Sequence, residues 1–129
     1  MASNSKINEI VKLSKTAPVL AVGYSKEQFG ESTIIEGGIP SKSLGVVNTA
    51  KGLQAPTWLY GIMKGKASHQ IIIDGIDLID KESQEKFYEL LKYKAISDID
   101  LPDDCNIIVL AKDLKKVSET IIRLCLLIK

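Results

Sequence analysis

Three short runs of mainly aliphatic residues constrain the fold of this chain more than any other feature. They occupy residues 18–23 (PVLAVG), 69–74 (HQIIID) and 106–111 (NIIVLA). Each run is compact and is bounded by proline, glycine or polar residues, which is typical of a β-strand. The three consecutive isoleucines of the second run indicate a strand that is buried on both faces. The sequence therefore predicts a sheet that contains three buried strands.

Helical periodicity appears before and between these runs. Apolar residues recur at helical spacing over residues 5–15, with Ser5 or Asn4 in position to cap the helix. Pro56 favours the start of a second helix, and Gly65 favours its end. The apolar face expected for this second helix consists of Trp58, Leu59, Ile62 and Met63.

A third helix and several short elements complete the pattern. Asp80 is placed to cap a helix in which Phe87, Leu90 and Leu91 repeat at helical spacing. Further short elements are predicted as strands at 32–35, 44–48 and 124–128, a helical turn at 117–122 and an acidic connection at 96–104. Strands that alternate with helices predict an α/β fold, with a mostly parallel sheet flanked by helices.

Length and charge restrict the class of protein. A chain of 129 residues corresponds to one domain, and its formal net charge of +1 supplies no overall field that would attract nucleic acid or an anionic membrane. Residues 1–6 are polar where a signal peptide would be apolar, and no apolar run is long enough to span a membrane. We therefore expect a cytoplasmic protein with neither membrane nor nucleic acid as its partner.

The few sulfur and imidazole side chains argue against several catalytic classes. His69 is the only histidine, so the chain cannot form a catalytic triad that needs a further histidine or a metal site with several histidines. We expect His69 to be an ordinary polar residue at the start of a strand. Cys105 and Cys125 lack metal-ligand spacing and are expected to be small core residues. The aspartates of residues 98–104 lack the spacing of a calcium-binding loop, which favours a solvated loop.

The carboxyl ends of the predicted strands are the places where chemistry is expected, because open parallel sheets bind ligands there. Gly23 follows the first strand, and Asp74 ends the second. An aspartate directly after an aliphatic strand is well placed to hold a hydrated Mg²⁺ ion, as in nucleotide hydrolases. The alternative is that Asp74 caps a helix or turn.

The order of four segments resembles the AAA+ ATPase core, especially its MoxR-like and clamp-loader-like branches. These segments are Ala55–Met63 (APTWLYGIM), Ile71–Asp77 (IIIDGID), Gln84–Leu91 (QEKFYELL) and Leu101–Ile128. The resemblance covers about residues 55–128, more than half of the chain. It implies a truncated fold similar to that of P-loop NTPases, with residues 1–129 as a single α/β domain without the helical lid of the family.

The resemblance assigns Asp74 as the metal-binding Asp of the Walker B motif and Asp77 as its second Asp. Gly75 stands where the family has its catalytic Glu, which orients the attacking water. Lys112 or Asp113 falls where the family has a sensor Asn. Leu124 falls at the position of the finger arginine, with Arg123 one residue early. Most of the catalytic side chains of the family are therefore missing.

The phosphate-binding loop of the family is altered in this chain. A Walker A motif, G-x-x-x-x-G-K-[ST], cradles phosphates with backbone amides and a lysine. Here Gly23 and Gly30 are seven positions apart, and Glu31 precedes Ser32 where the lysine belongs. A carboxylate at this place repels a triphosphate. Lys26 lies inside the loop, but nothing in its spacing favours it as a substitute for the missing lysine. The candidate nucleotide-binding residues are Gly23, Lys26, Gly30 and Ser32.

The resemblance and the missing groups together predict a degenerate AAA+ relative without a cofactor. By analogy with inactive members of such assemblies, it would have a structural or regulatory role and bind a protein partner or associate with itself. One alternative is a divergent hydrolase that uses ATP and Mg²⁺, with Lys26 and Asp77 in place of the missing groups. Another alternative is that the chain is one piece of a larger ATPase.

Overall fold

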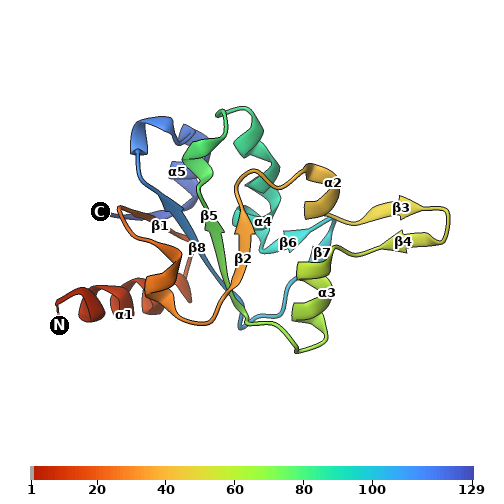
Figure 1. The fold of residues 1–129 in the computed structure, drawn as a ribbon, viewed down its shortest axis with the longest axis horizontal. Coiled ribbons are helices and arrows are strands. Elements are labelled where there is room, and N and C mark those ends of the chain that lie inside the picture. The colour runs from red at the N-terminus through yellow and green to blue at the C-terminus, as the bar shows by residue number, and fades with distance from the viewer. Residues whose placement is uncertain (1) are drawn as a thin grey trace.

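A five-stranded parallel sheet forms the centre of the molecule (Figure 1). The computed structural model describes residues 2–129, with side chains described from residue 5 onward. The strands of the sheet, in their spatial order, are β2 (Thr33–Glu36), β5 (Gln70–Asp74), β8 (Asn106–Ala111), β1 (Val19–Val22) and β9 (Leu126–Ile128). The fold is α/β, as the alternation of strands and helices predicts.

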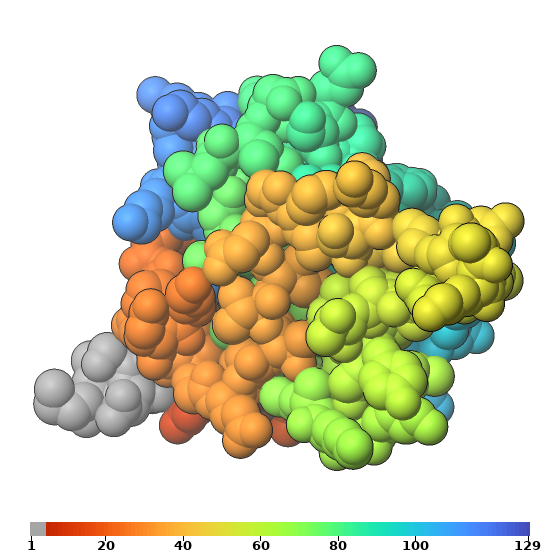
Figure 2. Space-filling view, turned by 45° about the vertical axis from the view of Figure 1, so that its right-hand side comes forward, coloured from red at the N-terminus to blue at the C-terminus, as the bar shows by residue number. Residues whose placement is uncertain are grey.

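Helices lie on both faces of the sheet, and two small hairpins accompany it. The α-helices are α1 (Ala2–Ser14), α2 (Ser41–Leu44), α3 (Thr57–Met63), α4 (Tyr88–Tyr93) and α5 (Glu119–Leu124). The 3₁₀ helices are η1 (Lys26–Phe29), η2 (Ile76–Leu78), η3 (Ser83–Phe87) and η4 (Leu114–Lys116). The hairpins are β3 (Val47–Thr49) with β4 (Gly52–Gln54), and β6 (Ala95–Ile96) with β7 (Ile99–Asp100). The β3–β4 hairpin projects from the body of the molecule (Figures 1 and 2).

Each face of the sheet has its own apolar cluster, because alternate residues of a strand point to opposite sides. On one face, Ala21 and Leu110 pack with Ile10 of α1. On the other face, Leu20 and Val109 belong to a larger cluster that contains buried side chains of α3, η3, α4 and α5. All six residues of β8 are buried, since this strand lies at the centre of the sheet.

The connection from β1 to β2 is short and contains η1 as its only helix. Residues 23–32, all of which the structure describes, link the two strands. Phe29 of η1 joins the cluster that α1 forms on its face of the sheet. The N-terminal helix α1 and η1 therefore cover this face of the sheet together.

Several sequence predictions need correction at their boundaries. The first helix begins at Ala2, so Asn4 and Ser5 lie within it rather than at its cap. The strand predicted at residues 44–48 begins only at Val47, because Pro40 starts the helical turn α2 and Leu44 is buried at its end. The main-chain oxygen of Leu44 accepts a hydrogen bond from the Trp58 indole at 2.9 Å, which fixes that turn.

Other predicted features are confirmed or refined. The side chain of Asp80 accepts hydrogen bonds from the main-chain N–H and the hydroxyl of Ser83, so it fixes the turn before η3, whose N-cap residue is Glu82; η3 leads into α4. Met63 is half exposed rather than buried on the inner face of α3. The acidic connection at residues 96–104 contains most of the β6–β7 hairpin. Among the described residues, no helix combines the length and apolarity that a membrane crossing requires.

Candidate functional site

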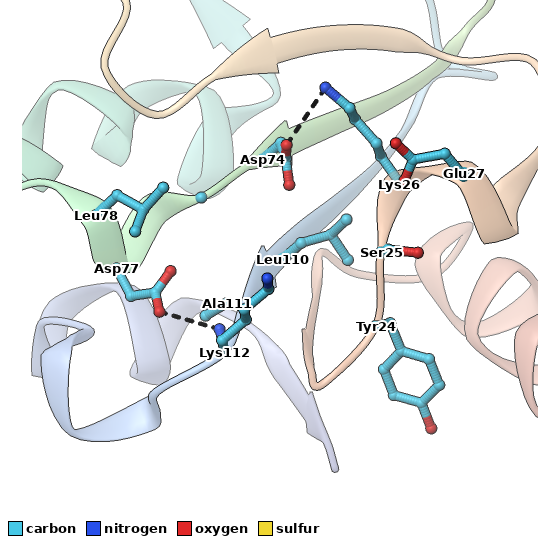
Figure 3. A pocket seen from close by; sticks show the side chains of 11 residues that line it. Tyr24, Ser25, Lys26, Glu27, Asp74, Asp77, Leu78, Leu110, Ala111 and Lys112 are labelled. Atoms are coloured by element: carbon cyan, nitrogen blue, oxygen red, sulfur yellow. Dashed lines mark hydrogen bonds and ion pairs between the residues drawn. The ribbon is translucent and has the colours of Figure 1, made fainter.

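The carboxyl ends of β1, β5 and β8 enclose a pocket (Figure 3). Its walls come from residues 24–27 after β1, residues 74–78 after β5 and residues 110–112 at the end of β8. The chain leaves β1 toward the face covered by α1 and leaves β8 toward the face covered by α5. Adjacent strands whose connections diverge in this way create the crevice in which α/β proteins bind ligands.

Lys26 and Asp74 meet across this pocket (Figure 3). The Lys26 Nζ lies 3.2 Å from Glu36 Oε1 and 3.6 Å from Asp74 Oδ2. Glu36 and Asp74 are register partners at the ends of adjacent strands, so the ammonium bridges two neighbouring carboxylates. The hydrogen bond and charge of Glu36, with a further contribution from Asp74, raise the pKa of Lys26 above its ordinary value. The predicted metal ligand Asp74 therefore already has a cationic partner.

Gly75 occupies a backbone conformation that suits glycine. Its φ of 73° and ψ of 37° are left-handed, and a Cβ there would lie 2.9 Å from the Leu78 Cδ1. Leu78 is 84% exposed and can move away, but the backbone remains unfavourable for a side chain. A glutamate at this position would be strained, so the backbone conformation suits the glycine that stands there.

Gly37 lies against the same turn from the neighbouring strand. Its N–H donates to the Asp74 main-chain oxygen at 2.7 Å, and a Cβ at Gly37 would be 2.6 Å from the main-chain oxygen of Gly75. This contact involves backbone atoms, so it cannot be relieved by a side-chain rotation. The close approach of Gly37 and Gly75 holds the end of β5 in place.

Asp77 serves as an anchor for the chain after β8. It is 8% exposed, and its Oδ2 accepts the main-chain N–H groups of Lys112 at 3.0 Å and of Asp113 at 2.9 Å. The Asp113 carboxylate in turn accepts the N–H of Lys115, which caps η4. The side chain of Lys112 lines the pocket. Asp77 thus lies beside the pocket with one carboxylate oxygen already bonded twice.

Three main-chain N–H groups in the loop after β1 donate hydrogen bonds within the protein. Gly23, whose φ is 92°, donates its N–H to Ala111 O at 2.9 Å and so extends the pairing of β1 with β8. The N–H of Ser25 donates to Gln28 Oε1 at 2.8 Å, and the N–H of Gln28 donates to Ser25 O at 3.1 Å. A phosphate-binding loop needs such amides directed at the ligand.

The structure separates the four predicted nucleotide-binding residues. Gly23 and Lys26 lie at the carboxyl edge, near Asp74. Gly30 and Ser32 lie at the amino edge, because the chain runs along the sheet through η1 before β2 begins. The Ser32 hydroxyl accepts a hydrogen bond from Gln70 Nε2 at 2.8 Å, at the start of β5. These two residues do not line the pocket that contains Asp74.

At the position that the resemblance assigns to the finger arginine, Leu124 is half-buried and ends α5. Arg123 is exposed and its Nη2 lies 3.4 Å from the Glu119 carboxylate, four residues earlier in the same helix. Such an exposed pair within one helix contributes little to stability.

Glu36 is a site residue that the sequence argument missed. It ends β2 just as Asp74 ends β5, so the same reasoning about carboxyl ends applied to residues 32–35 indicates it. The spacing of Lys26 gave no sign that its ammonium reaches Asp74. That contact depends on η1, which turns the chain back along the sheet.

Comparison with known proteins supports the α/β fold of the chain. No protein-family model matches the chain, and no curated protein matches it in sequence. The solved structures that match include the crystal structure of a "putative ATPase" from Cytophaga hutchinsonii, with a TM-score of 0.53 and 9% sequence identity. The match covers 85% of this chain and 38% of that chain, so this chain spans well under half the length of that protein. The chain therefore has an α/β fold that resembles, in its coarse arrangement, the fold of that protein.

Proposed function

We propose that this chain is an ATPase-like domain that does not hydrolyse ATP and acts as a structural or regulatory component by binding a protein partner. The main support for the proposal is that main-chain N–H groups in the loop after β1 already donate hydrogen bonds within the protein. The N–H groups of Gly23, Ser25 and Gln28 are satisfied by acceptors of the chain itself. A triphosphate that used these three N–H groups would have to displace their bonds, and each displaced acceptor would then need a new partner.

Charge around the pocket also opposes a polyanion. Lys26 is shared between Glu36 and Asp74, and the carboxylates of Glu27 and Asp77 line the same pocket, with Lys112 as its second cation. If Lys26 turned to a phosphate, the two carboxylates at the strand ends would lose their shared cation and face each other. Two neighbouring carboxylates, here those of Glu36 and Asp74, disfavour each other's charged state. The pocket therefore favours its internal ion pairs over a nucleotide.

At position 75, where the resemblance places the residue that positions the attacking water, the pocket has no side chain that could do so. Gly75 has no side chain, and its left-handed backbone disfavours a replacement carboxylate. A positioned general base contributes typically about 10²–10⁴-fold to a rate, which corresponds to about 3–5 kcal/mol of barrier. Nucleotide turnover is therefore not supported by the residues that line this pocket.

The edge strand β9 supports a role in binding a protein. It pairs with β1 on one side and lies at the end of the sheet, and its Leu126 and Leu127 are each about 40% exposed. An apolar edge strand is a template for pairing with another chain. If the partner is a second copy of this chain, sedimentation will show dimers of the wild type and monomers of Leu126→Lys at the same concentration. Monomers of both proteins contradict self-association through β9.

Phosphate release tests the proposal directly. Purified protein mixed with ATP and Mg²⁺ is expected to release phosphate no faster than the Asp74→Ala variant, because neither protein holds a competent site. Phosphate release by the wild type that Asp74→Ala abolishes would establish turnover at this pocket and overturn the proposal.

The second candidate function is a divergent nucleotide hydrolase, and the contact of Lys26 with Asp74 favours it. A lysine and an aspartate that face each other at 3.6 Å are the two groups that phosphate and Mg²⁺ need. ATP–Mg²⁺ at 100 times its Kd would stabilise the fold by about 2.7 kcal/mol. A thermal shift of that size in the wild type, lost in Lys26→Ala, would favour this function, and the absence of a shift would exclude it.

A further inference from the structure

Three side chains with different donor atoms converge at the amino-terminal edge of the sheet, at the end opposite to Asp74. They are His69, Asp104 and Cys105, and their donor atoms all lie within 4.8 Å of one another. The Nδ1 of His69 is 2.7 Å from Asp104 Oδ1. No step of the proposed function uses these residues, so this cluster needs its own explanation.

The sheet itself holds two of the three residues in place. His69 directly precedes β5 and Cys105 directly precedes β8, and these strands are parallel neighbours. The Asn106 N–H donates to the main-chain oxygen of His69 at 3.0 Å, and the Cys105 N–H donates to Pro102 O at 3.0 Å. Donor side chains carried on paired strand ends are pre-organised, whereas donors on a free loop must be ordered when the ligand binds.

The surroundings of the cluster leave one side open to solvent. Cys105 is 1% exposed, the His69 side chain is 31% exposed and the Asp104 side chain is 73% exposed. The ammonium of Lys94 donates to Asp103 O at 2.8 Å and fixes the segment beside Asp104. The exposed aspartate can therefore adjust its position, while the buried thiol and the half-buried imidazole keep theirs.

The donor set selects for one kind of ligand. Imidazole nitrogen, thiolate sulfur and carboxylate oxygen are the three donors that Zn²⁺ takes in proteins, whereas Mg²⁺ and Ca²⁺ prefer oxygen alone. A thiolate and a carboxylate together balance the charge of a divalent cation. Tetrahedral bonds of about 2.0–2.3 Å place ligand atoms about 3.3–3.8 Å apart. The His69 Nδ1 and Asp104 Oδ1 atoms, 2.7 Å apart, would have to separate slightly, and no pair of donors, all within 4.8 Å of one another, would have to close by more than about 1–1.5 Å.

We propose that His69, Asp104 and Cys105 form a binding site for a transition-metal ion of the Zn²⁺ class, with a fourth position open to water. The site is independent of the proposed function, because it uses other residues at the other end of the sheet. On binding, the Cys105 thiol releases its proton to solvent, and the sulfur, one imidazole nitrogen and one carboxylate oxygen become ligands.

Cobalt(II) is the probe for thiolate ligation. Titration of the reduced wild-type protein with Co²⁺ is expected to produce a thiolate-to-cobalt charge-transfer band in the near ultraviolet that saturates at one ion per chain. Cys105→Ser is expected to lose this band, and Cys125→Ser, which alters the other free cysteine, is expected to keep it. A wild type without the band, or a band that persists in Cys105→Ser, would overturn the proposal.

An exposed ligand provides a second test that does not disturb the core. Asp104→Asn is expected to weaken Zn²⁺ binding by at least about tenfold, since even partners outside the ligand set contribute about 10–100-fold. The neighbouring exposed residue Asp103 offers the matched variant Asp103→Asn, which is expected to bind Zn²⁺ like the wild type. Equal Zn²⁺ affinity in Asp104→Asn and wild type, measured by competition with a chelating dye, would contradict the assignment of Asp104.

Discussion

At the scale of single residues, the close approach of two glycines determines how β2 and β5 end. The Gly37 position has backbone atoms of Gly75 within 3 Å of where a Cβ would lie, whereas the next residue, Gly38, has nothing within 4 Å. Two adjacent glycines therefore differ sharply in what a methyl group would meet. The contrast allows the packing of the strand ends to be tested with a control one residue away.

We expect Gly37→Ala to lower the free energy of unfolding by about 1–3 kcal/mol, because a methyl group forces the ends of β2 and β5 apart. Gly38→Ala is expected to change the free energy of unfolding by less than about 1 kcal/mol. Urea denaturation of both variants and the wild type measures the difference. Equal stability of the two variants would show that Gly37 and Gly75 are not in contact.

Cys125 gives the unfolding free energy a dependence on alkaline pH. Burial raises the pKa of its thiol from 9.0 to about 12. In the unfolded chain the thiol loses its proton near pH 9, whereas in the folded chain it stays protonated, so the unfolded state binds fewer protons above pH 9. The stability contributed by the partly buried neutral thiol is present below pH 9 and is lost as the pH rises toward 12.

We therefore expect the wild type to lose stability faster than Cys125→Ala as the pH rises above 9. Chemical denaturation of both proteins under reducing conditions, from pH 8 upward, gives the difference in the free energy of unfolding. Groups that both proteins share, including the lysines, cancel in this difference. A difference that stays constant with pH would contradict a neutral, partly buried Cys125 thiol.

The sequence allowed only some of the side chains of the pocket and of the donor cluster to be predicted. Asp74 stood out because it ends an aliphatic run, and the structure places it in the pocket at the carboxyl edge. His69 and Cys105 each precede such a run, but their meeting depends on β5 and β8 being neighbours, which no local pattern contains. The contact of Lys26 with Asp74 likewise depends on the path of η1.

At the scale of elements, α1 acts as a cover for one face of the sheet. Ile10 is fully buried against strand residues that include Ala21, Ile72 and Leu110. The short connection between β1 and β2 contributes Phe29 of η1 to the same cluster. The N-terminal helix is therefore expected to be part of the cooperative fold rather than an appendage.

We expect Ile10→Ala to lower the free energy of unfolding by about 2–5 kcal/mol, through lost burial and the cavity left behind. Lys12→Ala, on the exposed side of the same helix, is expected to change it by no more than about 0.5 kcal/mol. Denaturant unfolding of the two variants checks this. A loss for Ile10→Ala as small as that of Lys12→Ala would show that α1 is only loosely attached.

The main strands and helices were predictable because their patterns are local. The runs at residues 69–74 and 106–111 became β5 and β8 to within one residue, since buried aliphatic residues have little alternative to a central strand. The predicted strand at residues 44–48 failed in part because the contact of Leu44 with Trp58 spans fourteen residues. Tertiary contacts of this kind override local propensity.

At the scale of the whole molecule, the sheet separates two regions of chemistry. The pocket with Lys26 and Asp74 lies at the carboxyl edge, and the cluster of His69, Asp104 and Cys105 lies at the amino edge. Distant sites without shared partners are independent in their energetics. Binding of Zn²⁺ at the amino edge and binding of ATP at the carboxyl edge can therefore be tested separately.

We expect Lys26→Ala to bind Zn²⁺ with the affinity of the wild type. The variant removes the cation that contacts Asp74 at the carboxyl edge and does not touch the donor cluster at the other end of β5 and β8. Competition with a chelating dye measures both affinities. A change of more than about tenfold would show that the two edges are coupled and that the donor cluster does not act as an isolated site.

The most direct test of the central claim is calorimetric titration of the wild type with a nonhydrolysable ATP analogue in the presence of Mg²⁺. The bonded loop amides of Gly23, Ser25 and Gln28 and the ion pairs of Lys26 predict no saturable binding. Binding of one analogue per chain, weakened by both Lys26→Ala and Asp74→Ala, would contradict that claim.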